Sequence, residues 1–216
     1  MGRGLNRLRR LAADLRTRRR FRFEGFWCEV PDGVVNPSRF AASRVFARAV
    51  REAAPPAPVD MLELGCGSGL ALLLPAAAGH RVTAVDIDPA AVQATRANLA
   101  RNGLQGAVHR SDWDACLGDA RYDYVVCNPP FMPERPTQLT TAFYAGPDLV
   151  FARAALAAMA ARLRPGGRGL LLTSSLSGRD RVCAVVRDAG LVHLKTHTVR
   201  DWNEVYYVDL LAQAGG

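Results

Sequence analysis

From residue 59 onward, short apolar runs of strand length alternate with longer stretches of helical length. This alternation is typical of a parallel sheet whose two faces are covered by helices. The pattern predicts strands at residues 59–64, 81–86, 106–111, 122–127 and 168–174. It predicts helices between them at residues 69–78, 89–102 and 147–164. The third helix is expected to end at Pro165-Gly166-Gly167, because proline and glycine are frequent helix stops.

The last two predicted strands are expected to pair differently from the parallel strands before them. A helix is predicted near 179–189, followed by strands at 191–199 and 204–213 that only a short turn separates. A turn that short permits only antiparallel pairing, because parallel strands need a long crossover connection. We therefore expect an α/β fold with a seven-stranded, mostly parallel sheet and a C-terminal antiparallel hairpin.

The region before the sheet predicts a small hairpin and a helix. Residues 21–35 combine aromatic and β-branched side chains around Pro31-Asp32-Gly33, which favours a hairpin with its turn at that triplet. A helix from Pro37 to about Arg51 should follow. The segment Pro55-Pro56-Ala57-Pro58 should end it, because proline breaks the helical hydrogen-bond ladder.

At 216 residues, the chain suffices for one sizeable core but is short for two. We expect a basic N-terminal arm, a hairpin and helix that form a lid, and a catalytic domain, at residues 1–24, 25–54 and 55–216. The first 22 residues hold nine arginines and one acidic residue, Asp14, in a chain of net charge +8. Clustered arginines are suited to RNA phosphates, and leucines at helical spacing favour an amphipathic helix in this arm. A solvated tail and a weak membrane-surface contact are the alternatives.

Neither a membrane span nor a metal site is expected. The longest apolar run, from Leu70 to Gly79, falls short of the roughly 20 residues that cross a bilayer, and Pro75 interrupts it. We therefore expect a cytoplasmic protein. The five cysteines form no C-x-x-C pair, so none is expected to bind metal or to be catalytic: Cys28, Cys66, Cys116, Cys127 and Cys183.

A glycine-rich segment, Glu63-Leu64-Gly65-Cys66-Gly67-Ser68-Gly69, stands between a predicted strand and a predicted helix. Glycines at this place let the backbone turn sharply and approach a ligand closely, while N–H groups at the helix start face that ligand. In doubly wound sheets the ligand crevice lies at this strand end. The spacing G-x-G-x-G differs from the G-x-G-x-x-G of nicotinamide and flavin binders, whose third glycine comes one place later.

Two carboxylates follow the second predicted strand. Asp86 lies about twenty residues after the glycines, where an acidic residue accepts both hydroxyls of a ribose, and Ile87 stands beside it. Asp88-Pro89 instead indicates the N-cap and first turn of the next helix.

The tetrapeptide Asn128-Pro129-Pro130-Phe131, which follows the fourth predicted strand, indicates the chemistry. Two prolines fix the backbone and remove two N–H donors, so the local carbonyl groups face the cleft without competing donors. The side-chain oxygen of Asn128 and the backbone oxygen of Pro129 are expected to hold the two hydrogens of an –NH2 group. Phe131 offers a flat face for a planar amide or base. No dedicated base is needed if the nitrogen attacks in its neutral form.

The glycine-rich segment at 63–69 and the tetrapeptide at 128–131 resemble motifs of class I S-adenosylmethionine-dependent methyltransferases. E-x-G-x-G-x-G resembles their first motif, which implies a Rossmann-like fold and S-adenosylmethionine as the cofactor. The resemblance places Glu63 near the methionine ammonium group, with Gly65, Cys66, Gly67 and Gly69 in the cofactor loop. It also makes Asp112 the acceptor of the adenine amino group and Trp113 a flank of the adenine ring. In the alternative interpretation, Asp112 caps a turn and Trp113 belongs to the core.

N-P-P-[YF] is similar to the signature of amino methyltransferases that act on protein glutamines or nucleobase nitrogens, and the resemblance covers about residues 30–175. Val34-Val35-Asn36-Pro37, Ala145-Gly146-Pro147-Asp148 and Leu163-Arg164-Pro165-Gly166-Gly167 resemble release-factor glutamine methyltransferases in order and spacing. Phe131 replaces that family's usual tyrosine and is common in small RNA base methyltransferases.

We therefore expect methyl transfer to a planar amide or amino nitrogen of a protein glutamine or an RNA base, with RNA contact through the basic arm. A methyltransferase of a small-molecule amine or natural-product intermediate is the first alternative. A nicotinamide-dependent oxidoreductase and a non-catalytic nucleotide-binding Rossmann protein use the same crevice and are the others. The oligomeric state does not follow from the sequence.

Overall fold

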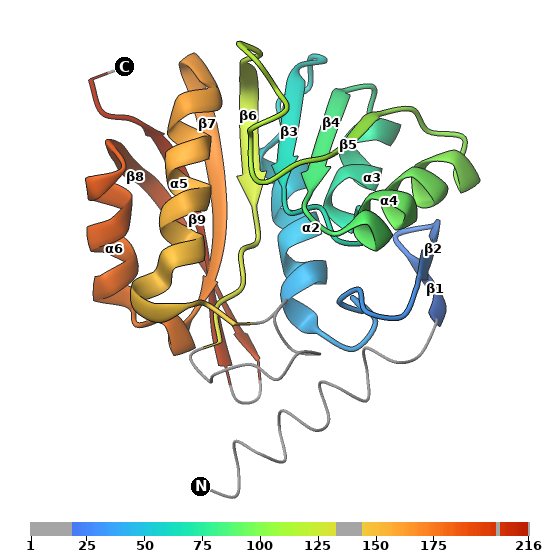
Figure 1. Cartoon of the computed structure of the whole chain (residues 1–216), viewed down its shortest axis with the longest axis horizontal. Coiled ribbons are helices and arrows are strands. Elements are labelled where there is room, and N and C mark those ends of the chain that lie inside the picture. The colour runs from blue at the N-terminus through green and yellow to red at the C-terminus, as the bar shows by residue number, and fades with distance from the viewer. Residues whose placement is uncertain (1–18, 133–143, 202–203, 216) are drawn as a thin grey trace, which may run out of the picture.

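The computed structural model describes residues 19–132, 144–201 and 204–215 of the chain (Figure 1). Its centre is a seven-stranded sheet with the order β5-β4-β3-β6-β7-β9-β8. The strands are β3 (Asp60–Leu64), β4 (Arg81–Asp86), β5 (Ala107–Arg110), β6 (Tyr122–Cys127), β7 (Leu163–Ser174), β8 (Leu191–Asp201) and β9 (Glu204–Gln213). The first five strands in this order are parallel, and β9 runs antiparallel to both β7 and β8. The predicted fold class is confirmed.

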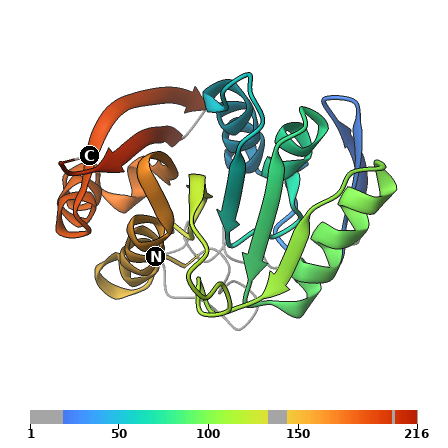
Figure 2. The ribbon, with the colours of Figure 1, turned by 90° about the horizontal axis from the view of Figure 1, so that it is seen from above.

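Helices cover both faces of this sheet (Figure 2). They are α2 (Ala41–Ala53), α3 (Leu70–Ala77), α4 (Pro89–Arg101), α5 (Val150–Arg162) and α6 (Arg179–Asp188). Short 3-10 turns, η2 (Pro147–Leu149) and η3 (Ser175–Ser177), precede α5 and α6. No helix within the described ranges is long and apolar enough to cross a membrane.

Alternation along the strands divides the apolar core between the two faces. On β3, the buried side chain of Met61 packs into the cluster formed with α2 and α3, whereas Leu62 and Leu64 pack into the cluster formed with α5 and α6. On β6, Val126 packs into the cluster with α2 and α3, and Val125 packs into the cluster with α5 and α6. Successive side chains of a strand point to opposite faces, so strands covered on both sides are apolar at every position.

The N-terminal hairpin has its turn earlier than predicted. β1 (Arg19–Phe23) and β2 (Phe26–Val30) pair antiparallel around Glu24-Gly25. Pro31-Asp32-Gly33 does form a turn, in which the N–H of Val34 donates to the carbonyl of Pro31 over 3.4 Å, but its place as the hairpin turn is wrong. Glu24 and Gly25 both have positive φ angles, 48° and 91°, as a two-residue hairpin turn requires. Of the basic arm, only residues 19–24 lie within the described part of the chain.

Two helix boundaries also differ from the prediction. α2 begins at Ala41, well after Pro37, because the Oδ1 of Asn36 accepts hydrogen bonds from the backbone N–H and the hydroxyl of Ser38, which forms a turn there. α5 ends at Arg162, and β7 begins directly after it. Pro165-Gly166-Gly167 therefore lies inside the strand, at a register irregularity between β6 and β7.

Candidate active site

A cavity of about 730 Å³ opens where β3, β4 and β6 end. In Figure 1 these three strands lie side by side and their carboxyl ends point to the same edge of the sheet. All but one of the predicted site residues line the cavity, namely Glu63, Gly65, Cys66, Gly67, Asp86, Ile87, Asp112, Trp113, Asn128, Pro129, Pro130 and Phe131. The exception is Gly69. Parallel strands thus bring together short segments that are far apart in the sequence.

The glycine-rich loop turns sharply between β3 and α3. The φ angles of Gly65, Gly67 and Gly69 are 72°, 54° and 76°, values that residues with a Cβ atom rarely adopt. The N–H groups of Gly65 and Cys66 both donate to the carbonyl of Val85 on the neighbouring strand, over 2.9 and 3.1 Å. The loop is therefore anchored at its start and free to present its backbone to the cavity.

Gly69 has a packing role instead of a place in the cavity wall. A Cβ at this position would lie 2.7 Å from Cγ2 of Thr95 on α4. The hydroxyl of Thr95 donates to the carbonyl of Gly67 over 3.2 Å and contacts Cys66 Sγ over 3.3 Å. The absence of a side chain at residue 69 thus lets α4 pack directly on the loop.

Asp86 lies at the end of β4 with both carboxylate oxygens turned to backbone N–H groups. Its Oδ2 accepts from Gly67 and its Oδ1 accepts from Asp88, each over 2.9 Å. Burial raises the pKa of Asp86, and the backbone hydrogen bonds of Asp88, Gly67 and Ile87 oppose that rise. Each oxygen keeps a further acceptor position, which suits a ligand with two hydroxyl groups.

Asp88 has the structural role that the sequence predicts. Its Oδ1 accepts from the N–H of Ala90 over 2.8 Å, and Pro89 occupies the first turn of α4. The N-cap assignment is confirmed.

Glu63 is a buried carboxyl group at the end of β3. Among the described residues, its Oε2 atom has no hydrogen-bond partner. Burial raises the pKa of Glu63 well above its ordinary value, and the negative charge of Asp86 adds to the rise. A buried acceptor without a partner is unfavourable unless a ligand satisfies it. A cationic group fits here, and the ammonium group of S-adenosylmethionine is such a group.

The segment after β5 places Asp112 and Trp113 on the cavity wall. The side chain that caps this turn is Ser111, whose Oγ accepts from the N–H of Cys116 over 3.1 Å. Trp113 has a positive φ angle of 46° and is only partly buried against the core. A left-handed backbone at a bulky residue costs about 1–3 kcal/mol and is found most often at functional sites.

Asn128 and Phe131 form the opposite wall. Among the described residues, Asn128 Oδ1 is buried without a hydrogen-bond partner. Pro129 and Pro130 have no N–H group to offer it. The ring of Phe131 lies edge-on to Tyr206 with centroids 6.3 Å apart, which fixes its plane. Asn128 and Phe131 therefore both line the cavity.

Sequence reasoning missed several residues of this wall. Phe40 and Phe46 come from the region of α2, and Glu204 and Tyr206 come from β9. The hydroxyl of Tyr206 donates to Glu204 Oε2 over 3.2 Å. No motif marks these residues: the insertion of β9 between β7 and β8 brings Glu204 and Tyr206 to the site, and the packing of α2 brings Phe40 and Phe46.

A sheet of this order, with a glycine-rich loop and a carboxylate at the carboxyl ends of two neighbouring strands, is that of a class I S-adenosylmethionine-dependent methyltransferase. Within that class, the chain belongs to the family described as the methyltransferase small domain, whose model matches residues 40–180.

Relatives of known activity share parts of the chain. Ribosomal RNA small subunit methyltransferase C of Chromohalobacter salexigens is 38% identical over 122 residues, which are 56% of this chain and 33% of that protein. Release factor glutamine methyltransferase of Gloeobacter violaceus is 34% identical over 157 residues, 66% of this chain and 54% of that protein. The chain thus spans about a third to a half of the length of these relatives.

Among solved structures, a T. thermophilus 16S rRNA N2 methyltransferase in complex with AdoMet and guanosine is similar, with a TM-score of 0.68 and 27% identity. The match covers 92% of this chain and 50% of that one.

Proposed function

We propose that the protein transfers a methyl group from S-adenosylmethionine to the exocyclic amino nitrogen of a nucleobase in RNA. When bound, S-adenosylmethionine supplies an electrophilic methyl group on a sulfonium. Glu63 binds its ammonium group, and Asp86 accepts its ribose hydroxyls. Asp112 accepts the adenine amino group, and Trp113 flanks the adenine ring. The turn from Gly65 to Gly67 lies against the methionine part, with Ile87 beside the adenosine.

The buried Oδ1 of Asn128 carries this proposal. An amide oxygen without a hydrogen-bond partner among the described residues is suited to accept from a ligand N–H. Pro129 contributes a carbonyl and no donor, so an –NH2 group meets two acceptors here. These two acceptors orient the nitrogen lone pair and stabilise the positive charge that develops on nitrogen. The proton leaves after transfer, so no side-chain base is required.

Phe131 favours a planar acceptor. Its ring packs against Tyr206 in a T-shaped contact and lines the cavity, where a planar base or amide can stack on an aromatic ring. Stacking of a base on an aromatic ring contributes about 1–3 kcal/mol in single-stranded nucleic acid complexes. An aliphatic amine would gain little from this arrangement.

One comparison and one sequence feature favour RNA over other acceptors. The rRNA N2 methyltransferase structure matches nearly the whole chain and holds guanosine, a planar base with an exocyclic –NH2 group. The arginine-rich residues 1–22 supply positive charge for phosphate contacts, which give salt-dependent affinity for RNA. We propose that this arm contacts the RNA substrate outside the cavity.

A protein glutamine is the second candidate. The relative from Gloeobacter violaceus is a release factor glutamine methyltransferase, and a glutamine amide also presents an –NH2 group to Asn128 and Pro129. The two candidates share the chemistry at nitrogen and differ in what surrounds it.

The test uses radiolabelled cofactor with RNA, protein and small-molecule fractions of a cell extract. We expect label in RNA, and loss of at least 100-fold of that activity in Asn128→Ala because the amino group loses one of its two acceptors. Calorimetry should show cofactor binding retained. Asn102→Ala, which removes an amide from the contact between α4 and the hairpin, serves as the matched control. Label confined to protein would favour glutamine, and full activity of Asn128→Ala would refute the mechanism.

A further inference from the structure

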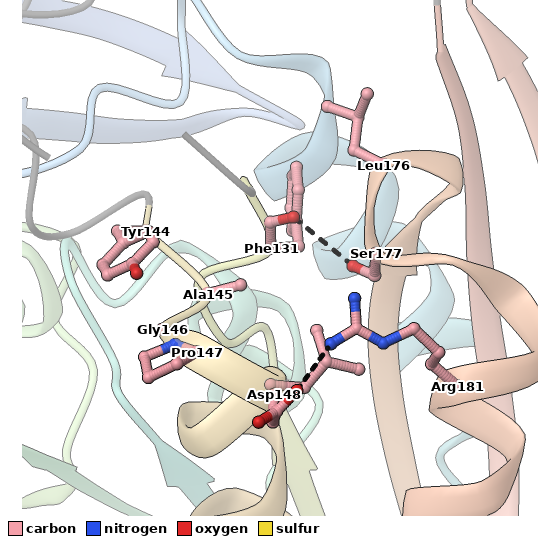
Figure 3. A pocket seen from close by; sticks show the side chains of 10 residues that line it. Phe131, Tyr144, Ala145, Gly146, Pro147, Asp148, Leu176, Ser177 and Arg181 are labelled. Carbon is pink, nitrogen blue, oxygen red and sulfur yellow. Dashed lines mark hydrogen bonds and ion pairs between the residues drawn. The ribbon is translucent and has the colours of Figure 1, made fainter. Parts of the chain in front are cut away.

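A second cavity of about 210 Å³ adjoins the site on the other side of Phe131. Phe131 lines both cavities, so the cofactor cavity and this smaller one meet at this residue. Figure 3 shows the smaller cavity between the segment of residues 144–149 and the start of α6. An acceptor that stacks on Phe131 would therefore extend into this second cavity.

The chain is held in an unusual conformation to form the cavity. The N–H of Ala145 donates to the carbonyl of Met132 over 2.8 Å, which ties this segment to the residue that directly follows the tetrapeptide 128–131. Asp148 and Leu149 both have positive φ angles, 49° and 57°, although neither is glycine. Consecutive left-handed residues of this kind are strained, and such strain is concentrated at binding and catalytic sites.

The charged groups that line the cavity are one guanidinium group, Arg181, and one carboxylate, Asp148. The guanidinium group of Arg181 lies between Asp148 and Ser177 (Figure 3). It contacts Asp148 Oδ1 over 3.5 Å, and the Asp148 side chain is 93% exposed. An ion pair this long and this exposed to water contributes little, so an anion can compete for the guanidinium group. The hydroxyl of the buried Ser177 donates to the carbonyl of Phe131 over 3.4 Å, and Tyr144 lies across the cavity from it (Figure 3).

We propose that this cavity binds a phosphate group of the acceptor nucleotide, with Arg181 as its main ligand. The inference rests on the proposed function, because only a nucleotide acceptor carries a phosphate a short distance from its base. Arginine binds phosphate through parallel N–H groups, and hydroxyl groups complete such sites. Phe131 would then hold the base while Arg181 holds the backbone, which fixes the register of the RNA.

Phosphate dependence is tested with four acceptors: guanosine without phosphate, its 5′- and 3′-monophosphates, and a short RNA oligonucleotide. We expect Arg181→Gln to raise KM for the phosphate-bearing acceptors by about tenfold, because the phosphate loses its charged hydrogen-bond donor. Arg181→Lys should retain part of the effect, because it keeps the charge and loses the planar fork. The ratio kcat/KM for guanosine should not change. The slope of log affinity against log salt should fall by about one for the oligonucleotide.

The matched control is Arg187→Gln, which removes the same charge from an exposed position at the other end of α6. A KM effect of equal size in both variants, or an equal effect on guanosine and on its monophosphates, would overturn the phosphate site. If the wild-type protein methylates neither RNA nor guanosine, the proposed function fails. Activity of the wild type toward both, with unchanged KM in Arg181→Gln, removes only the phosphate site.

Discussion

The carboxylate of Asp86 is bonded to the glycine-rich loop through the N–H of Gly67, which donates to Oδ2 over 2.9 Å. Asp86 ends β4, whereas Gly67 follows β3, and the two strands pair in parallel with Leu64 beside Val85. One side chain therefore fixes the position of the loop relative to the neighbouring strand end. The same carboxylate faces the cavity, so loop geometry and ligand binding depend on one residue.

Replacement of Asp86 should weaken cofactor binding. Asp86→Ala removes the tether of the loop and the acceptor proposed for the ribose, and hydrogen bonds to charged groups contribute about 1.5–3 kcal/mol each. We expect the Kd of S-adenosylmethionine, measured by calorimetry, to rise by at least tenfold. Asp88→Ala is the control, because it removes an N-cap and should lower stability by about 1 kcal/mol while leaving Kd unchanged. Equal losses of affinity in both variants would contradict the assignment.

Gly69→Ala should destabilise the protein through a collision with α4. The new Cβ would lie 2.7 Å from Thr95 Cγ2, and the φ angle of +76° disfavours alanine as well. The expected loss is about 1–3 kcal/mol in the free energy of unfolding, measured by urea denaturation. Gly103→Ala has a similar φ angle of +67° with no atom within 4 Å, so it reports the backbone part alone. A second change, Thr95→Ala, should restore part of the difference between the two variants.

Asp209 is a buried carboxylate that joins α6 to the C-terminal hairpin. Its side chain is fully buried and accepts from Arg179 over 2.5 and 2.8 Å and from the Thr196 hydroxyl over 2.7 Å. Asp209→Ala should therefore lower the free energy of unfolding by about 3–5 kcal/mol, because the guanidinium group loses its buried partner. Arg179→Leu combined with Asp209→Leu should be less harmful than the sum of the single changes. Asp188→Ala, at an exposed ion pair with Arg153, should change stability by less than about 1 kcal/mol.

The parallel part of the fold was predictable because its signal is local. β4 and β6 have the predicted bounds, and α4 differs by one residue from its prediction. Strands that are apolar at every position, followed by amphipathic or alanine-rich helices, leave few other arrangements. Short-range periodicity is sufficient for elements of this kind.

The errors occur where long-range contacts or single side chains decide the boundary. The hairpin turn lies at Glu24-Gly25 because β2 is anchored to α4, where Asn98 accepts from the N–H of Glu29 and Asn102 accepts from the N–H of Trp27. The turn-forming triplet Pro31-Asp32-Gly33 gives no sign of this contact between β2 and α4. Likewise, pairing with β6 extends β7 through Pro165-Gly166-Gly167, a triplet that on sequence alone predicts the end of a helix.

For the site, motifs located the residues that a parallel sheet brings to one edge. Asp86 and Asn128 could be placed because each follows a strand of the same sheet at its carboxyl end. Tyr206 could not be found, since its position depends on the antiparallel insertion of β9 beside β7. The cavity that contains Arg181 was equally hidden, because it forms only when residues 144–149 and α6 are placed side by side.

Thiol reactivity should follow burial. Burial raises the pKa of Cys28 to about 12 and raises the pKa values of Cys66 and Cys127 as well, so these thiols remain protonated at neutral pH. Cys116 is exposed and Cys183 is partly exposed. Iodoacetamide at pH 8 should therefore alkylate Cys116 first and the three buried cysteines only after unfolding, as peptide mass spectrometry would show. Early modification of Cys66 in the folded protein would contradict this burial.

Glu63 should make the ligand-free protein less stable as the pH rises. Its pKa in the folded state is raised well above the ordinary 4.5, so between that value and the raised pKa the folded protein binds more protons than the unfolded chain. The free energy of unfolding therefore falls through this window. Glu63→Gln should flatten the dependence in urea titrations at pH 5 and 7.5, while weakening S-adenosylmethionine binding by about tenfold through loss of the carboxylate. Glu24→Gln, whose carboxyl pKa is lowered by Arg48, should instead lose stability at neutral pH. An unchanged pH profile in Glu63→Gln would show that this carboxyl group does not oppose folding.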